Sequence, residues 1–301
     1  MKVLVGIDGS EHSGLAVRFT AELLSKVKDQ IALCYALPQS RVPWAATLDD
    51  RMNREISAAV FSSARSYLPE TFRDHVEEIV SSQDPRSGLV AAAADCRADL
   101  LAVGAKGAGP VQRLLLGSVS QGVVHTAPIP VLVVRDGRHQ TAQDFPVLFA
   151  HDGSRHWTDA AELLSQFSWP AVTLGRVMTV IEPFFPREVP QWLERKNVDP
   201  EWEKIALGWL ADYEKERQSR VELLAKCQAK LPEPFHRAHP IVAEGNPAEQ
   251  ILKLAEQQNA RLIIIGRRGL GMTARWLLGS TSEPVLSHAP CSVLVLPRPE
   301  E

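Results

Sequence analysis

The chain repeats itself once, and this repeat constrains its fold more than any other feature. An apolar run that ends in Asp-Gly-Ser occurs at 5–10 and again at 149–154, an offset of 152 − 8 = 144. A glycine-rich stretch at 104–107 returns at 266–269, an offset of 266 − 104 = 162. Motifs that recur in the same order over so long a period indicate two duplicated domains rather than a solenoid, and a length of 301 residues agrees.

A polar stretch at 135–144 separates the two copies and lacks apolar periodicity, so it is the predicted linker. We therefore expect one domain at 1–137 and a second at 144–301. The second copy carries 162 − 144 = 18 additional residues, which fall within the aromatic-rich segment 183–220. This segment is suited to a lid, a partner surface or a longer helix packed on its own domain, and the usual packing role of aromatic side chains favours the helix.

Strands and helices alternate within each copy. Continuous apolar strands such as 131–134 are typical of a parallel sheet that is covered on both faces. The pattern predicts an α/β fold: two tandem flavodoxin-like or Rossmann-like domains, each with a five-stranded parallel sheet. The expected strands are 2–7, 31–36, 75–81, 99–103 and 130–134, then 146–151, 173–180, 237–243, 262–265 and 292–296. The expected helices of the first copy are 12–26, 48–67, 85–96 and 118–126, and Asp84-Pro85 and Asn246-Pro247 are typical helix starts.

Composition excludes several classes of protein. The formal net charge is −3 and the pI about 6.3, which argues against a nucleic-acid binder. The amino-terminal residues form an expected strand rather than a signal peptide, and no apolar run is long enough to span a membrane. We therefore expect a soluble, cytoplasmic protein without membrane or nucleic-acid partners. The four cysteines lack any C-x-x-C pair, which favours small buried thiols over metal or redox chemistry.

Both glycine-rich stretches follow the pattern G-x2-G-x9-G-S, with glycines and serine at Gly104, Gly107, Gly117, Ser118 and at Gly266, Gly269, Gly279, Ser280. Each begins at the carboxyl end of an apolar strand and closes before an expected helix. Free N–H groups at a helix N-terminus favour phosphate, and the serine is placed to cap the helix and to donate its hydroxyl. Neither a Walker A loop nor the dinucleotide fingerprint fits this spacing. The alternative is a pair of ordinary turns with helix caps.

This pattern resembles the nucleotide-binding signature of the universal stress protein family, and the resemblance covers nearly the whole chain twice. It implies an adenine nucleotide alpha hydrolase-like fold and binding of ATP or AMP. It places Asp8 and Asp152 at the adenine or ribose, and the glycines and serines at the phosphates, with Val119 and Thr281 next in the closing helices. The simpler interpretation of the two aspartates is a turn fixed by Asx hydrogen bonding, which is compatible with the first. Arg113, Arg267 and Arg275 carry charges suited to phosphate, although solvated surface arginines are the simpler interpretation.

No catalytic set is recognisable, so we expect a nucleotide-binding stress or signalling module with at most slow ATP hydrolysis. Mg²⁺ would arrive with the nucleotide. One alternative is an adenylyl-transferring enzyme, although the loop after the first strand lacks the second glycine that such enzymes carry. Another is a nucleotide-free scaffold in which the two domains pair through 131–134 and 293–296, with a further homodimer possible. The sequence leaves open whether one site or both are filled.

Overall fold

A computed structural model describes residues 1–37, 50–73, 75–107, 116–136, 144–152, 157–182, 200–267 and 278–297. The first half contains β1 (Lys2–Ile7), α1 (Glu11–Glu22), β2 (Gln30–Ala36), α2 (Asp50–Ser66), α3 (Glu70–Arg73), β3 (Val76–Ser81), α4 (Pro85–Asp95), β4 (Leu100–Gly104), α5 (Ser118–Thr126) and β5 (Val131–Val134). The second half contains β6 (Phe145–Ala150), α6 (Trp157–Gln166), β7 (Thr173–Ile181), α7 (Pro200–Gln228), the short 3-10 helix η2 (Glu233–His236), β8 (Ile241–Glu244), α8 (Pro247–Gln257), β9 (Leu262–Gly266), α9 (Ser282–His288) and β10 (Ser292–Leu296).

The described strands form one ten-stranded sheet in the order β3-β2-β1-β4-β5-β10-β9-β6-β7-β8. Within each half the pairings are parallel, which confirms the predicted α/β class. The strand order reverses beside β1 in the first half and beside β6 in the second. Ligands of doubly wound sheets bind at the carboxyl ends of strands at such points, so each half has one candidate cleft.

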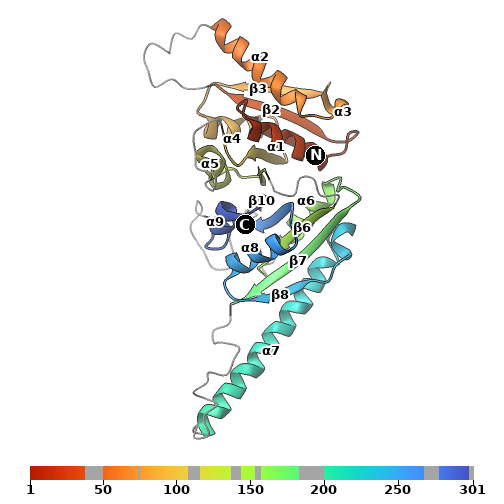
Figure 1. Ribbon diagram of the computed structural model, residues 1–301, viewed down its shortest axis with the longest axis vertical. Coiled ribbons are helices and arrows are strands. Elements are labelled where there is room, and N and C mark those ends of the chain that lie inside the picture. Colours follow the sequence, from red (N-terminus) through yellow and green to blue (C-terminus); the bar gives the residue numbers. More distant parts are fainter. Residues whose placement is uncertain are drawn as a thin grey trace.

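The two halves meet through their last strands, which pair antiparallel with Leu132 opposite Leu294. This confirms the predicted pairing of the two domains within the chain. Figure 1 shows the halves stacked one above the other, with β10 at the junction. Because β5 also pairs with β4 and β10 also pairs with β9, both last strands have a neighbour on each side, and neither is left as an open edge that would pair with another chain.

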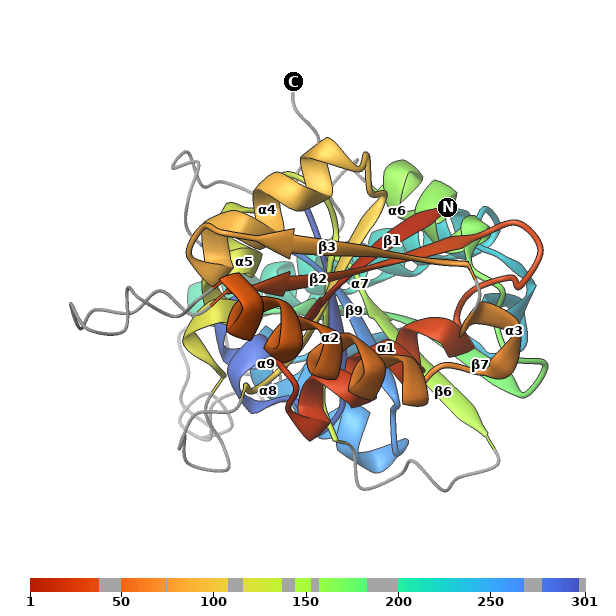
Figure 2. The ribbon, with the colours of Figure 1, turned by 90° about the horizontal axis from the view of Figure 1, so that it is seen from above.

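Side chains alternate between two apolar layers, one on each face of the sheet. Residues of α1, α2, α6 and α7 belong to one layer, and residues of α4, α5, α8 and α9 belong to the other. Seen from above, α4 lies across β2 and β3 from α1 and α2 (Figure 2). Both layers contain residues from the two halves, so burial of apolar surface holds the halves together as well as each domain.

Helix starts follow the local sequence. The Asp84 carboxylate accepts hydrogen bonds from the main-chain N–H groups of Arg86 and Ser87, and Asn246 accepts one from the N–H of Glu249. Proline is the first residue of α4 and of α8, as predicted, because its missing N–H would have had no partner inside the helix.

Arg261 joins the two halves on the α1 side of the sheet. Its Nη2 lies 2.9 Å from Oε2 of Glu22, and its guanidinium carbon lies 4.5 Å from the ring centroid of Phe145. The ring of Phe145 in turn lies 5.7 Å from that of Phe19. An ion pair and a cation–π contact therefore bridge α1 and the start of β6.

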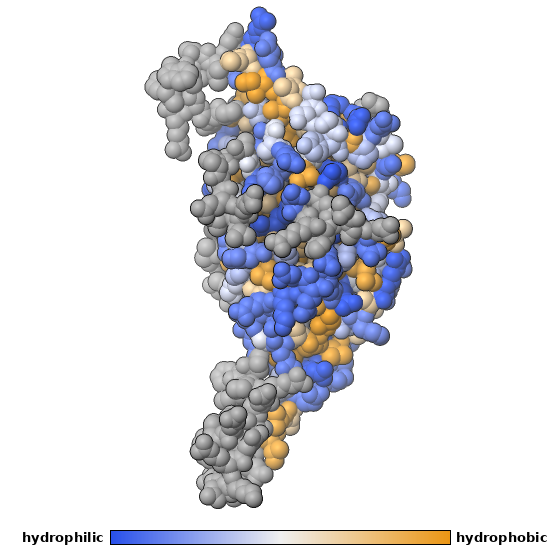
Figure 3. Space-filling model, viewed as in Figure 1, coloured by the Kyte–Doolittle hydropathy of each residue, from blue (hydrophilic) through white to orange (hydrophobic). Residues whose placement is uncertain are grey.

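Two sequence-based expectations are corrected. The strand expected at 237–243 is observed as Ile241–Glu244, because the chain bends at 237–238 directly after η2 and Pro240 has no N–H to give to a strand. The 29-residue helix α7 begins inside the aromatic segment and runs beyond it to Gln228. Among its described side chains, the fully buried ones are Leu224 and Cys227, in its carboxyl-terminal part. Its amino-terminal part carries exposed apolar residues, among them Ile205, Leu207, Trp209 and Leu210. Apolar surface is visible at this lower end of the molecule in Figure 3. The aromatic residues at 184, 185 and 192 lie outside the described residues.

Within the described part of the chain, no helix combines the length and the apolar character that crossing a bilayer requires.

All four cysteines are free, and Cys34, Cys227 and Cys291 are buried. Burial raises the pKa of each of these three thiols from 9.0 to about 12. Because the folded pKa lies above the unfolded one, the stability that they contribute is complete below pH 9.0 and is lost as the pH rises to about 12.

At pH 8 we expect a thiol reagent to label half-buried Cys96 first and the other three only after unfolding. Mass spectrometry after timed alkylation measures this, and early labelling of Cys34 would contradict it.

Candidate functional site

The first glycine loop is closed by three hydrogen bonds. The N–H of Ala105, directly after β4, donates to the carbonyl of Val134 over 2.7 Å, and the N–H of Gly117 donates to the carbonyl of Ala105 over 2.8 Å. The Oγ of Ser120 donates to the carbonyl of Gly104 over 2.6 Å. The bonds from Gly117 and Ser120 thereby connect the carboxyl end of β4 to the first turn of α5.

The second loop repeats these three bonds. The N–H of Arg267 donates to Leu296 over 2.8 Å, and the N–H of Gly279 donates to Arg267 over 2.9 Å. The Oγ of Ser282 donates to Gly266 over 2.7 Å. Every participant is displaced by the same interval, for example 279 − 117 = 162 and 282 − 120 = 162. The repeat seen in the sequence is therefore a repeat of main-chain geometry.

Both closing helices begin without a side-chain cap from the described residues. Gly117 is the N-cap of α5 and Thr281 that of α9, and at neither does a side chain accept a hydrogen bond from the first turn. The first N–H groups of an α-helix have no partner within the helix, so these ends can donate to an anion.

The predicted capping role of Ser118 is wrong, because Ser118 is already the first helical residue of α5. The hydroxyl that matters for the loop belongs to Ser120, with Ser282 as its counterpart. Sequence reasoning missed both, although the repeated pattern G-S-x-S at 117–120 and 279–282 carried the signal.

Asp8 lies against the first loop. A Cβ added to Gly107 would stand 2.5 Å from its Oδ2, and a Cβ added to Gly104 would stand 2.7 Å from the carbonyl oxygen of His12 in α1. Oδ1 of Asp8 accepts from the N–H of Ser10 at 3.0 Å and from its Oγ at 2.5 Å. Asp8, Gly104, Gly107 and the start of α5 therefore converge, and glycine is needed where the chain segments approach most closely.

Asp152 takes the corresponding place after β6. That strand pairs with β9, with Ala150 opposite Ile265, so Asp152 lies near Gly266. Its carbonyl oxygen accepts a 2.9 Å hydrogen bond from Nη1 of Arg220 in α7. Val119 and Ser118 lie in the first turn of α5, and Ser280 lies beside Thr281 before α9. Arg113, Gly269 and Arg275 lie outside the described residues.

The side chain of Arg267 forms hydrogen bonds at the end of α5. It turns to the other half, where Nη2 donates to the carbonyl of Ala127 over 2.9 Å and Nε donates to that of Val124 over 3.0 Å, at the carboxyl end of α5. Arg135 does the reverse, since its Nη2 donates to Leu286 at 2.5 Å and Ser287 at 3.2 Å in α9. Each closing helix is thus capped at its carboxyl end by an arginine of the other half, which no sequence signal indicated.

Glu283 in the first turn of α9 strengthens this contact between the halves. Its Oε1 accepts from Nε2 of Gln121 at 3.2 Å, and its Oε2 lies 3.5 Å from Nε2 of His125. Burial lowers the pKa of the Arg135 guanidinium.

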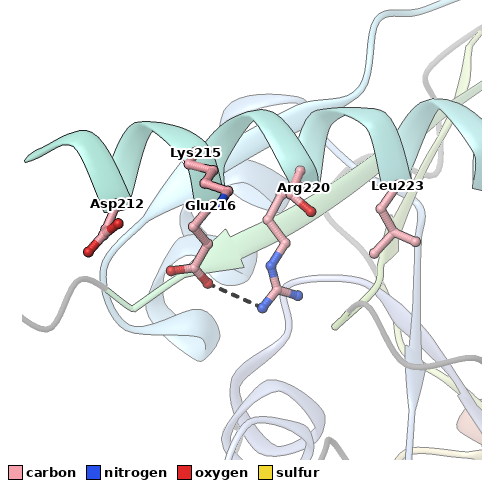
Figure 4. Close-up of a pocket in the computed structure, with 6 residues that line it drawn as sticks. Asp212, Lys215, Glu216, Arg220 and Leu223 are labelled. Carbon is pink, nitrogen blue, oxygen red and sulfur yellow. Dashed lines mark hydrogen bonds and ion pairs between the residues drawn. The ribbon is translucent and has the colours of Figure 1, made fainter. Parts of the chain in front are cut away.

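A depression of about 400 Å³ lies along α7 (Figure 4). Its described lining consists of Asp212, Lys215, Glu216, Ser219, Arg220 and Leu223. Since Arg220 also touches Asp152, this depression adjoins the carboxyl end of β6. Among the described residues, no three His, Cys, Asp or Glu side chains are grouped to hold a metal ion.

A family model described as the universal stress protein family matches residues 1–135 and 197–297. The chain belongs to the universal stress protein family. A universal stress protein of Mycolicibacterium smegmatis is 29% identical over 98% of this chain and 96% of its own length. One from Mycobacterium tuberculosis is 26% identical over 97% of this chain and 95% of its own.

A crystal structure of a universal stress protein from Archaeoglobus fulgidus shares this fold. Its TM-score is 0.64 at 22% sequence identity, covering 99% of this chain and 98% of that one. This likeness and the family match together confirm the family predicted from the two glycine loops and show two universal stress protein-like domains in one chain.

Proposed function

We propose that this universal stress protein binds ATP or AMP at its two glycine loops and acts as a nucleotide-responsive stress or signalling module of the cytoplasm. One observation carries the proposal. In both halves the same three hydrogen bonds hold the start of the closing helix next to the glycine at the end of β4 or β9, and neither helix start has a side-chain cap from the described residues. Main-chain N–H groups at such an end, together with the helix dipole, favour phosphate.

The nucleotide would lie across the strand ends. Its phosphates would contact Gly117, Ser118 and Val119 in the first site, and Gly279, Ser280 and Thr281 in the second. Its nucleoside would extend toward Asp8 in the first site or Asp152 in the second. Asp8 lies against Gly107, and Asp152 lies near Gly266 at the end of β9. Mg²⁺ would be held mainly by phosphate oxygens and water. We propose binding rather than turnover, since the sequence shows no recognisable catalytic set.

Titration calorimetry of the full chain with ATP and with AMP, each with and without Mg²⁺, tests the proposal. We expect saturable binding that approaches two nucleotides per chain, whereas inorganic phosphate alone should bind far more weakly. Mass spectrometry of the denatured protein should show co-purified adenine nucleotide. Absence of both signals would overturn the proposal, and steady release of pyrophosphate from ATP would favour an adenylyl-transferring enzyme instead.

A nucleotide-free scaffold is the second candidate, favoured by the exposed apolar part of α7. Patches of this kind often mark protein contacts. Sedimentation measurements with and without ATP distinguish the candidates, because a homodimer that forms without nucleotide, in a protein that binds none, would support the scaffold.

A further inference from the structure

The carboxyl-terminal parts of α2 and α7 are counterparts, although α7 is much longer. Buried apolar residues recur along both helices and just after them at an interval of 163, as in 224 − 61 within the helices and 231 − 68 beyond their ends. The pairs are Phe61 and Leu224, Ala64 and Cys227, Leu68 and Leu231, and Phe72 and Phe235. The same interval places Arg220 where the first half has Ser57.

These two residues behave differently. Ser57 is buried, and its Oγ donates to the carbonyl of Asn53 within its own helix over 2.7 Å. Arg220 instead reaches out of α7 to the carbonyl of Asp152 at 2.9 Å. Asp152 is the counterpart of Asp8. The second cleft therefore carries a guanidinium at its nucleoside end, where the first has a small hydroxyl satisfied by its own helix.

The position of α7 relative to the second glycine loop determines which part of a bound nucleotide the Arg220 guanidinium would face. Leu224 of α7 and Val285 of α9 belong to opposite apolar layers of the sheet. A nucleotide whose phosphates lie at α9 and which crosses the ends of β9 and β6 therefore brings its ribose and base toward α7. The Asp152 carbonyl uses only part of the donor capacity of a guanidinium, so further N–H groups remain for a ligand.

Other charges lie around Arg220. Oε1 of Glu216 stands 3.4 Å from its Nη2, and Asp212 and Lys215 line the same depression (Figure 4). The ion pair with Glu216 is long, and Glu216 is half exposed, so an incoming phosphate would displace it at small cost. A phosphate accepts paired hydrogen bonds from a guanidinium, which a free ribose hydroxyl does not.

We propose that Arg220 is a specificity-determining residue of the second site, where it favours an adenosine nucleotide bearing a second phosphate on a ribose hydroxyl over one with a free ribose. Arginine serves this purpose in dinucleotide sites that accept a ribose 2′-phosphate. The inference rests on the proposed function, because it assumes that the second site holds an adenine nucleotide.

The test compares AMP with adenosine 2′,5′-bisphosphate and adenosine 3′,5′-bisphosphate by calorimetry in a Gly117→Val background, which confines binding to the second site. Arg220→Ser installs the residue of the first half. Arg220→Gln keeps a donor for the Asp152 carbonyl but removes the charge. Both variants should lower the affinity for the preferred bisphosphate about tenfold and change the affinity for AMP by less than about twofold. Which bisphosphate responds identifies the hydroxyl.

Glu216→Gln is the matched control of opposite sign, since removing the competing carboxylate should raise the affinity for the bisphosphate. In a Gly279→Val background, which leaves only the first site, replacing Arg220 or Glu216 should leave the affinities for AMP and for the bisphosphates unchanged. If Arg220→Gln and Arg220→Ser leave the ratio of bisphosphate to AMP affinity unchanged while AMP still binds, the inference fails and the proposed function stands. If AMP does not bind the second site at all, both fail there.

Discussion

Replacing Gly117 by valine should remove the first nucleotide site, and replacing Gly279 by valine should remove the second. A Cβ on Gly117 already stands 3.3 Å from the carbonyl oxygen of Ala105 and 3.5 Å from the Cα of Lys106. The branched carbons of valine must therefore push the loop away from the start of α5 or enter the space where phosphate would lie. We expect at least a hundredfold loss of affinity at the altered site, about 3 kcal/mol.

Titration with ATP measures this as a stoichiometry that falls from two to one in each variant and to zero in the double variant. Gly208→Val is the matched control, because a Cβ on this exposed residue of α7 meets nothing within 4 Å. Thermal unfolding shows whether a variant has lost its fold rather than its site. An unchanged stoichiometry in two folded variants would refute the assignment of the glycine loops.

Replacing Arg135 and Arg267 together by alanine should loosen the contact between the halves. Each guanidinium supplies hydrogen bonds to carbonyls at the carboxyl end of the other half's closing helix. Removing a charged donor from a buried carbonyl costs about 2 kcal/mol, so the double variant should lose about 4 kcal/mol of unfolding free energy if the two sites are independent.

Urea unfolding of the two single variants and the double variant measures these losses. Arg51→Ala serves as the control, because Arg51 forms an exposed ion pair with Glu55 on α2 and its replacement should change little. A double variant as stable as the natural protein would show that strand pairing and the apolar layers alone hold the halves together. Lysine at either position should restore only part of the loss, since its ammonium cannot span two carbonyls as a planar guanidinium does.

Much of the fold was predictable because its signals are local. Apolar runs in the sequence indicate the buried strands, and Asp84-Pro85 and Asn246-Pro247 indicate the starts of α4 and α8. The start of β8 was less predictable, because η2 ends directly before the expected strand, with Phe235 packed against Trp169 at a ring-centroid distance of 5.6 Å, and Pro240 has no N–H to give to a strand. The length of α7 was likewise not predictable, because an aromatic-rich sequence is compatible with a lid, a partner surface or a helix.

By itself the sequence determined the duplication, the α/β class and the two glycine loops at the ends of β4 and β9, because these depend on residue types at fixed spacing along the chain. Only the tertiary structure decided where long charged side chains go. Arg267 turns to α5, Arg135 to α9 and Arg220 to the carbonyl of Asp152. An arginine has many rotamers of similar energy, and its direction is chosen by carbonyl groups that folding brings close from distant parts of the chain.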